Sequence, residues 1–181
     1  GLLQVPPSDL GQVEIIKGAA SALYGGQALG GVINLVSKYP GSEPSGEVIL
    51  NATTREGQDI SGYGEAKLNN LFRTSFLANV SRQSAQDLDE DQWIDMPSYH
   101  RVALRPRLFY ESDEGTTALL TMGVMNEDRQ GGTVPNGLTP NGKSFPQDLT
   151  TRRLDAGIKL SHPINDAISL EVRASSMRQD H

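Results

Sequence analysis

The sequence predicts a mainly β protein: part of an antiparallel up-and-down β-barrel with about seven strands, preceded by the end of a small α+β domain. Two observations predict this fold class. From residue 46 onward, apolar and polar residues alternate with a period of two, as on strands with two different faces. Before that region, the uncharged run 18–37 contains five glycines. Each glycine costs about 1 kcal/mol in a helix interior, so this run is not a membrane-spanning helix.

The composition narrows the range of functions. A formal net charge of −6 argues against a general nucleic-acid binder, because phosphate binding needs a basic surface. The chain has no cysteine, which excludes disulfides, thiolate metal sites and cysteine nucleophiles. No motif of a catalytic nucleophile occurs, and His100, His162 and His181 lack the spacing of metal ligands. We therefore expect neither an enzyme nor a bound cofactor.

The region before residue 46 predicts a compact unit with two buried strands. Residues 13–17 and 31–38 are rich in β-branched side chains and bounded by glycine, as strands are. Between them, 19–24 allows one helical turn at most. The glycines match neither a P-loop nor a dinucleotide-binding motif. A Pro/Gly/Ser-rich segment follows, and we place the domain boundaries at 1–40 for the first domain, 41–46 for a hinge and 47–181 for the strands.

Seven segments after the hinge alternate between an apolar and a polar face. The predicted strands are 47–53, 60–68, 72–82, 101–108, 117–124, 153–161 and 168–175. Ile49 and Leu119 are exceptions, because they lie on the polar side. Pro106 cannot donate a backbone hydrogen bond, so we expect a local bulge in the fourth strand.

Alternation alone does not tell which face is dry. A soluble barrel turns its apolar face inward, whereas a membrane barrel turns it outward. The connections favour the membrane barrel: 69–70, 112–115 and 163–166 are tight, while 83–99 and 130–151 are long and polar. Short and long connections alternate along the chain, as expected when the two rims lie on opposite sides of a membrane.

The polar faces of the predicted strands carry many arginines. They are Arg73, Arg101, Arg105, Arg107, Arg153 and Arg173. A dry core would not accept such a set unpaired, whereas a water-filled lumen would, so we expect these side chains to face a lumen. Aromatic residues make up only 6% of the chain, which is low for membrane-interface girdles. The alternative is a soluble barrel or sandwich that binds a small molecule or a protein.

The segment QVEIIKGAASALYGGQALGGVINLVSKYP (12–40) contains three blocks in a fixed order: V-E-x-x-[KR]-G, S-x-L-Y-G and G-G-V-I-N-x-[VI]-[ST]-K. In these blocks it resembles the C-terminal part of the plug domain of TonB-dependent outer-membrane receptors. The resemblance implies energy-coupled uptake of a scarce nutrient, most often a ferric siderophore, across the bacterial outer membrane. Barrels of this class have 22 strands around a plugged lumen, so we expect the chain to be a fragment that lies in membrane lipid.

The same resemblance implies roles for individual residues and a protein partner. Tyr24 matches a position near the ligand at the plug apex in some siderophore receptors. Glu14 and Lys17 match charged positions that pair with the barrel wall. The partner TonB is expected to bind through a box that this chain does not contain.

An acidic loop between the third and fourth strands is a weak candidate for Ca²⁺. Asp87, Asp89 and Asp91 match the first three oxygen ligands of an EF-hand loop. Gln92 stands at the sixth position, where glycine is needed, and Ser98 at the twelfth, where glutamate is needed. An EF-hand is therefore excluded, and a solvated loop is the plainer interpretation of this cluster.

Overall fold

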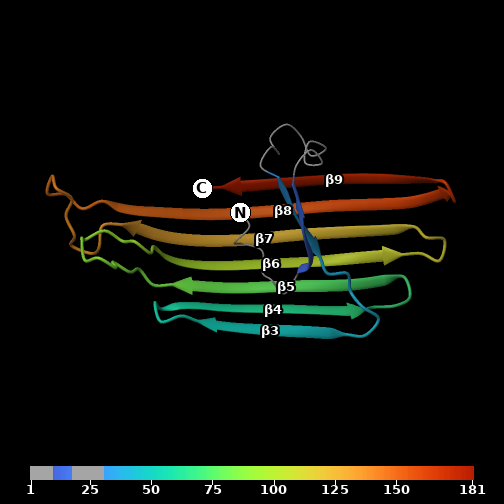
Figure 1. Ribbon diagram of the computed structural model, residues 1–181, viewed down its shortest axis with the longest axis horizontal. Coiled ribbons are helices and arrows are strands. Elements are labelled where there is room, and N and C mark those ends of the chain that lie inside the picture. The colour runs from blue at the N-terminus through green and yellow to red at the C-terminus, as the bar shows by residue number, and fades with distance from the viewer. Residues whose placement is uncertain (1–9, 18–30) are drawn as a thin grey trace. The chain divides into compact units, whose positions relative to one another are not determined.

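The computed structural model describes residues 10–17 and 31–181, and the chain divides into two compact units, Gly1–Pro40 and Gly41–His181 (Figure 1). In the first unit, β1 (Leu10–Ile16) and β2 (Val32–Ser37) form an antiparallel pair, which confirms the two strands predicted there. The predicted burial is wrong: Val13, Ile15 and Ile33 are at least half exposed. The helical turn predicted at 19–24 lies outside the described residues.

The second unit is a seven-stranded antiparallel sheet in which each strand pairs with the next in sequence (Figure 1). Its strands are β3 (Ser45–Ala52), β4 (Gly57–Lys67), β5 (Phe72–Gln83), β6 (Ser98–Glu111), β7 (Thr117–Gly132), β8 (Pro146–Asn165) and β9 (Ile168–Asp180). This order confirms the predicted up-and-down topology. Over 10–17 and 31–181 we find no helix that could cross a membrane.

The connections of the sheet differ between its two rims. At the rim drawn on the right of Figure 1 lie the short turns 68–71, 112–116 and 166–167. At the opposite rim lie one short turn, 53–56, and the two long loops 84–97 and 133–145. The predicted alternation of tight and long connections is confirmed from 68–71 onward, whereas 53–56 is a short turn at the long-loop rim.

The strand register gives the sheet two faces of different chemistry. Paired residues of adjacent strands point to the same side, and from β3 to β9 the pairs join residues of equal parity, except beside the last turn. We call the even-numbered side the apolar face and the odd-numbered side the polar face. Many large apolar side chains of the apolar face are 40–73% exposed: Val48, Leu50, Ile60, Phe76, Val80, Leu104, Leu120, Met122, Val124, Leu154, Ile158, Leu160, Leu170 and Val172.

The apolar face has a limited height along the strands. On β5 it runs from Phe72 to Val80, and on β6 from Val102 to Tyr110. At the short-turn end, the rings of Phe72 and Tyr110 lie 5.2 Å apart. Beyond Val80 and Val102, the next positions on this face are charged or titratable: Arg82, His100 and Asp128, which are neighbours in the register. The apolar face is therefore a band bounded by polar residues on the long-loop side.

Two predictions about the strands need correction. Strands β7 and β8 extend further toward the long loops than the alternation indicated, because both faces are polar there and the period of two is no longer visible. The bulge predicted at Pro106 is absent. The register between β6 and β7 is the same on both sides of Arg105 and Pro106, and only the pairing at these two residues is interrupted.

Two hydrogen bonds join the first and last residues of loop 133–145, and we call this closed base of the loop the backbone crossing. Thr133 N donates to Phe145 O at 3.0 Å, and Phe145 N donates to Thr133 Oγ1 at 3.0 Å. Gly132, just before this crossing, has φ of +92°, and a Cβ there would collide with the carbonyl oxygen of Phe145. Gly142, near the tip of the loop, also has positive φ but faces open space.

Candidate functional site

The polar face of the sheet carries all six arginines singled out from the sequence. Arg101 pairs in register with Glu127, Arg107 with Thr121, and Lys159 with Arg173. Every one of the six occupies an odd-numbered position of β5, β6, β8 or β9, so they share one side of the sheet. The same side carries acidic residues that pair with arginines, in groups that run from the long loops toward the short turns.

The first cluster lies beside the long loops and is centred on Glu127, which is 6% exposed. Arg101 Nε donates to Glu127 Oε2 at 2.5 Å, and Arg129 Nε donates to Oε1 at 3.1 Å. Both guanidinium groups also lie over the ring of Tyr99, at 5.2 and 5.4 Å from its centroid. One carboxylate thus binds two arginines, so the cluster keeps a net positive charge, and this charge lies next to an aromatic ring.

The second cluster crosses a whole strand. Arg105 on β6 reaches Asp155 on β8, with Arg105 NH1 3.0 Å from Asp155 Oδ2, and Arg153 Nε lies 3.2 Å from Asp155 Oδ1. The intervening residue on β7 is Gly123. A Cβ at Gly123 would lie 2.6 Å from Asp155 Oδ2 and 2.8 Å from Arg105 NH2, so a larger residue would push the ends of these two side chains aside.

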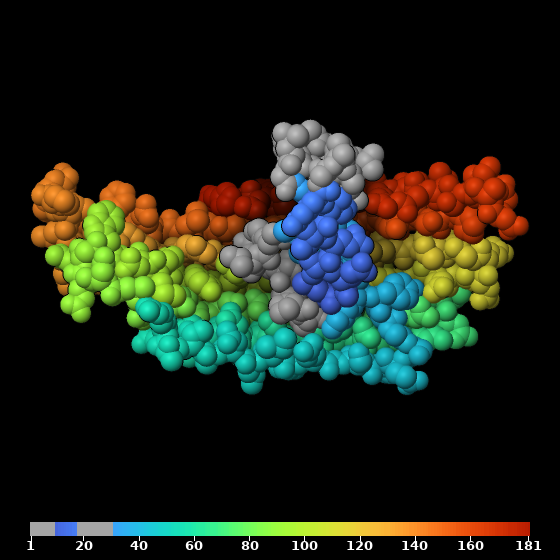
Figure 2. Space-filling view, viewed as in Figure 1, coloured from blue at the N-terminus to red at the C-terminus, as the bar shows by residue number. Residues whose placement is uncertain are grey.

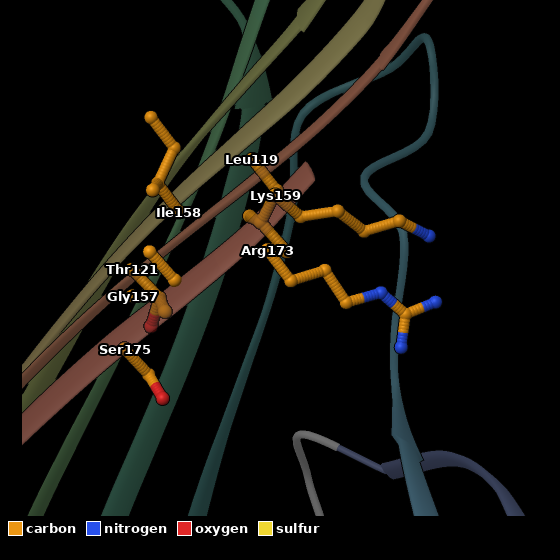
Figure 3. Close-up of a pocket in the computed structure, with 8 residues that line it drawn as sticks. Leu119, Thr121, Gly157, Ile158, Lys159, Arg173 and Ser175 are labelled. Atoms are coloured by element: carbon orange, nitrogen blue, oxygen red, sulfur yellow. The ribbon is translucent and has the colours of Figure 1, made fainter. Parts of the chain in front are cut away.

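The third group lies nearer the short turns and is more exposed. Arg73 NH1 is 2.9 Å from Glu111 Oε2, and Glu171 binds both Arg173 at 2.5 Å and Lys159 at 3.1 Å. Beside the last pair, a shallow hollow of about 290 Å³ opens where Gly157 has no side chain. Figure 3 shows Lys159 and Arg173 extending side by side from it, while Ile158 points to the opposite side of the sheet.

A separate contact holds the start of the second unit. Glu65 accepts a hydrogen bond from the hydroxyl of Tyr63 through Oε2 at 2.6 Å, and from the backbone N–H of Gly41 through Oε1 at 3.2 Å. Gly41 is the first residue after the boundary between the two units. The predicted hinge 41–46 is therefore tied at one end to β4, which the sequence pattern did not indicate.

The residues predicted in the first unit have local partners or lie outside the description. The carboxylate of Glu14 accepts hydrogen bonds from Asn34 Nδ2 at 2.8 Å and Gln12 Nε2 at 3.2 Å, both within the β1–β2 pair. Lys17 directly follows β1 and is exposed. Their pairing with a barrel wall stays a prediction. Tyr24, the predicted ligand contact, lies outside the described residues.

The acidic loop gathers a different set of carboxylates from the one predicted. Asp87, Asp89 and Asp95 offer oxygens within 4.8 Å of one another, whereas Asp91 Oδ1 accepts from the backbone N–H of Trp93 at 2.8 Å. Loss of hydration raises the pKa of Asp89 above its usual value, and the charge of Asp91 adds to this. Asp87, Asp89 and Asp95 are thus the residues of this loop that could hold a cation.

Two parts of this geometry were missed from the sequence. Arg129 belongs to the arginine set, and continuing the odd-numbered positions of 117–124 toward the loop would have found it. Glu127 and Asp155 each bind one arginine two residues away on the same strand, Arg129 and Arg153. Their other arginines, Arg101 and Arg105, lie 26 and 50 residues away, and only the strand register brings these pairs together.

The class of protein follows from the two faces together. Leu50, Leu104, Ile158 and Leu170 share no interior and are 41–73% exposed, while the arginines of the other face are paired with carboxylates. A soluble barrel or sandwich requires the reverse. An antiparallel meander with an apolar outer band and a polar inner side is the wall of a membrane-spanning β-barrel.

Comparison with known proteins narrows the class to a family. The family model of the TonB-dependent receptor plug domain matches residues 1–32. The ferrichrome outer membrane transporter/phage receptor of Escherichia coli K12 is 30% identical over 92% of the chain. The ferric enterobactin receptor of Pseudomonas aeruginosa is 41% identical over 70%. The ferrioxamine receptor of Yersinia enterocolitica is 30% identical over 72%.

A structural comparison supports the fold. The crystal structure of a ferric enterobactin receptor mutant from P. aeruginosa in complex with enterobactin matches 97% of the chain with a TM-score of 0.57 and 15% identity, and the match covers 36% of that receptor chain. The chain spans 17%, 24% and 16% of the ferrioxamine, ferrichrome and ferric enterobactin receptors named above. It is a segment of a TonB-dependent receptor of the bacterial outer membrane.

Proposed function

We propose that the chain is the end of the plug and the first seven barrel strands of a receptor that takes up a ferric siderophore. The observation that carries this is the exposed apolar band of β3–β9, backed by the ion-paired polar face. From Phe72 to Val80 the band covers nine residues of β5, which is the length that a tilted strand needs to cross a bilayer. The charged row at Arg82, His100 and Asp128 then lies at the level of the lipid headgroups.

The orientation in the membrane follows from the connections. Bacterial outer-membrane barrels have short periplasmic turns and longer extracellular loops. We therefore assign the turns 68–71, 112–116 and 166–167 to the periplasm, and the loops 84–97 and 133–145 to the cell exterior. On this assignment the cluster of Arg101, Glu127 and Arg129 lies on the luminal wall near the outer opening.

The chemistry of that wall suits an anionic ligand. Two guanidinium groups around one carboxylate leave an excess positive charge, and the ring of Tyr99 adds a surface for stacking. Relatives of the chain are receptors for ferrioxamine, ferrichrome and ferric enterobactin by name. We infer that Tyr24 contacts the ligand from the plug. The predicted luminal arginines either attract the ligand or hold the plug.

Transport would need partners but no covalent chemistry. In this proposal TonB transmits the energy of the inner-membrane proton gradient to the plug, and the chain acts as a transporter rather than an enzyme. Glu14 and Lys17 would fix the plug against the wall until that pull. Because a charge buried without its partner is costly, loss of either one would loosen the plug.

The test is uptake of radioactive iron by cells that express the full-length receptor and no other siderophore receptor. We expect uptake of at least one hydroxamate or catecholate ferric siderophore, abolished by deletion of TonB or by collapse of the proton gradient. Labelled cobalamin serves as the competing cargo, since a vitamin B12 transporter of Photobacterium profundum is 30% identical over 49% of the chain. Uptake of cobalamin alone, or uptake independent of TonB, would contradict the proposal.

A further inference from the structure

Gln92 joins the two long loops by two hydrogen bonds. Its backbone carbonyl accepts the N–H of Val134 at 3.0 Å, and its side-chain Oε1 accepts the N–H of Leu138 at 3.2 Å. Gln92 belongs to loop 84–97 and both donors belong to loop 133–145, so strands β6 and β7 separate them in sequence. Figure 2 shows the two loops, in green and orange, side by side at the left end of the sheet.

Gln92 is held in position from its own loop. Its φ of +75° is unusual for a residue with a side chain, and its N–H donates to Asp87 Oδ2 at 3.0 Å. This carboxylate keeps the carbonyl and the side chain of Gln92 pointing to the other loop. The residue is thus bound on one side by Asp87 and on the other by two backbone amides.

Further contacts extend the junction on either side of Gln92. Trp93 forms a β-bridge with Thr133, and its ring centroid lies 6.0 Å from that of Phe145. Ile94 N donates to Gly132 O at 2.8 Å. Trp93 and Phe145 remain 39% and 48% exposed, so the joined loops present two aromatic residues at their surface.

We propose that Gln92 is a positioning residue that joins loops 84–97 and 133–145 into one body. Separate loops of this length would open and close independently, because local opening depends on the contacts of each segment. Because Gln92 joins the two loops, a contact with one loop changes how readily the other loop opens. The consequence for ligand binding rests on the proposed function: a ligand that contacts either loop is held by both loops.

The experiment measures backbone amide hydrogen exchange in the full-length receptor in detergent, without any ligand. The variant Gln92→Met keeps the size of the side chain but removes the acceptor for Leu138. Phe145→Ala removes the ring contact from the other loop. The control variant, Gln130→Met at the exposed end of β7, makes the same chemical change. In the described part of the chain, the Gln130 side chain forms no hydrogen bond to either loop.

We expect reciprocity. Gln92→Met should speed exchange about fivefold across 134–145 and not at Leu138 alone, as loss of about one hydrogen bond predicts. Phe145→Ala should speed exchange across 86–96 by a similar factor, and Gln130→Met should leave both loops unchanged. Exchange in β6 reports whether each variant is folded, and if Gln92→Met is not, Gln92→Ala, which removes the same acceptor, takes its place.

The proposal is overturned if each variant changes only the loop that carries it, or only the amide next to it. Because no cargo is present, this result is separate from the uptake test. Reciprocal exchange in a receptor that takes up no siderophore would leave the joined loops established and remove the proposed cargo.

Discussion

The two faces of the sheet β3–β9 come from the same strands and yet reverse the usual rule of burial. On the polar face, Glu127 is nearly inaccessible and bound by two arginines. On the apolar face, Leu50 is 73% exposed. Soluble monomers rarely expose large contiguous apolar patches. This face instead exposes large apolar side chains on every one of its seven strands. The difference shows that the two faces meet two different solvents.

The largest effect should come from the polar face, at Glu127. Glu127→Ala leaves Arg101 and Arg129 without the carboxylate that they share, and we expect the free energy of unfolding to fall by about 3–5 kcal/mol. Urea unfolding of the receptor in detergent measures it. Glu114→Ala, in an exposed turn, is the control and should change little. Equal effects of the two variants would mean that the polar face is ordinary solvated surface.

A slightly smaller effect should come from a charge placed in the apolar band. Leu120→Arg, near the middle of the band on β7, should lower the free energy of unfolding in lipid vesicles by about 2–4 kcal/mol. Asn126→Arg, on the same strand and face but at the edge of the band, should cost only about 0–1 kcal/mol. If the two arginines cost the same, the apolar face does not lie in hydrocarbon.

A third effect concerns the tie at the start of the sheet. Glu65→Ala removes the acceptor of the Tyr63 hydroxyl and of the Gly41 amide, which should cost about 1.5 kcal/mol. Limited proteolysis should show faster cleavage within 41–46. Glu43→Ala, in the same segment, provides the comparison, and an unchanged cleavage rate in Glu65→Ala would count against the tie.

The smallest effect should come from an ion pair on the apolar side. Arg178 and Asp180 lie 3.2 Å apart at the long-loop end of β9, and both are largely exposed. Arg178→Ala should therefore change the free energy of unfolding by less than about 1 kcal/mol. Arg105→Ala breaks a more buried pair and should cost clearly more in the same measurement. A reversed order would show that exposure does not govern these pairs.

The sequence predicted the sheet well because its signal is local. Alternation over neighbouring residues predicts the strands, and the contrast between 112–116 and 84–97 predicts the rims. Alternation also placed the six arginines together on the polar face, where the register shows them. At Pro106 the prediction failed, since the strand loses a pairing there without changing its register.

What the sequence could not predict depends on residues far apart in the chain. Asp95 rather than Asp91 completes the acidic group: Asp95 Oδ2 accepts the backbone N–H of Leu88, which lies between Asp87 and Asp89, whereas Asp91 accepts from Trp93. Gln92 meets Leu138, 46 residues away, only once β6 and β7 are paired. Such contacts have no period and no motif, so they become visible only in three dimensions.

The backbone crossing at the base of loop 133–145 determines where this receptor segment tolerates engineering. Gly132 accepts no side chain, since the carbonyl of Phe145 occupies the space that a Cβ would need. Gly142 borders open space near the loop tip. If loop 133–145 faces the cell exterior, as proposed, an epitope tag or fluorophore for living cells belongs next to Gly142, and a library that randomises the loop should leave Gly132 fixed.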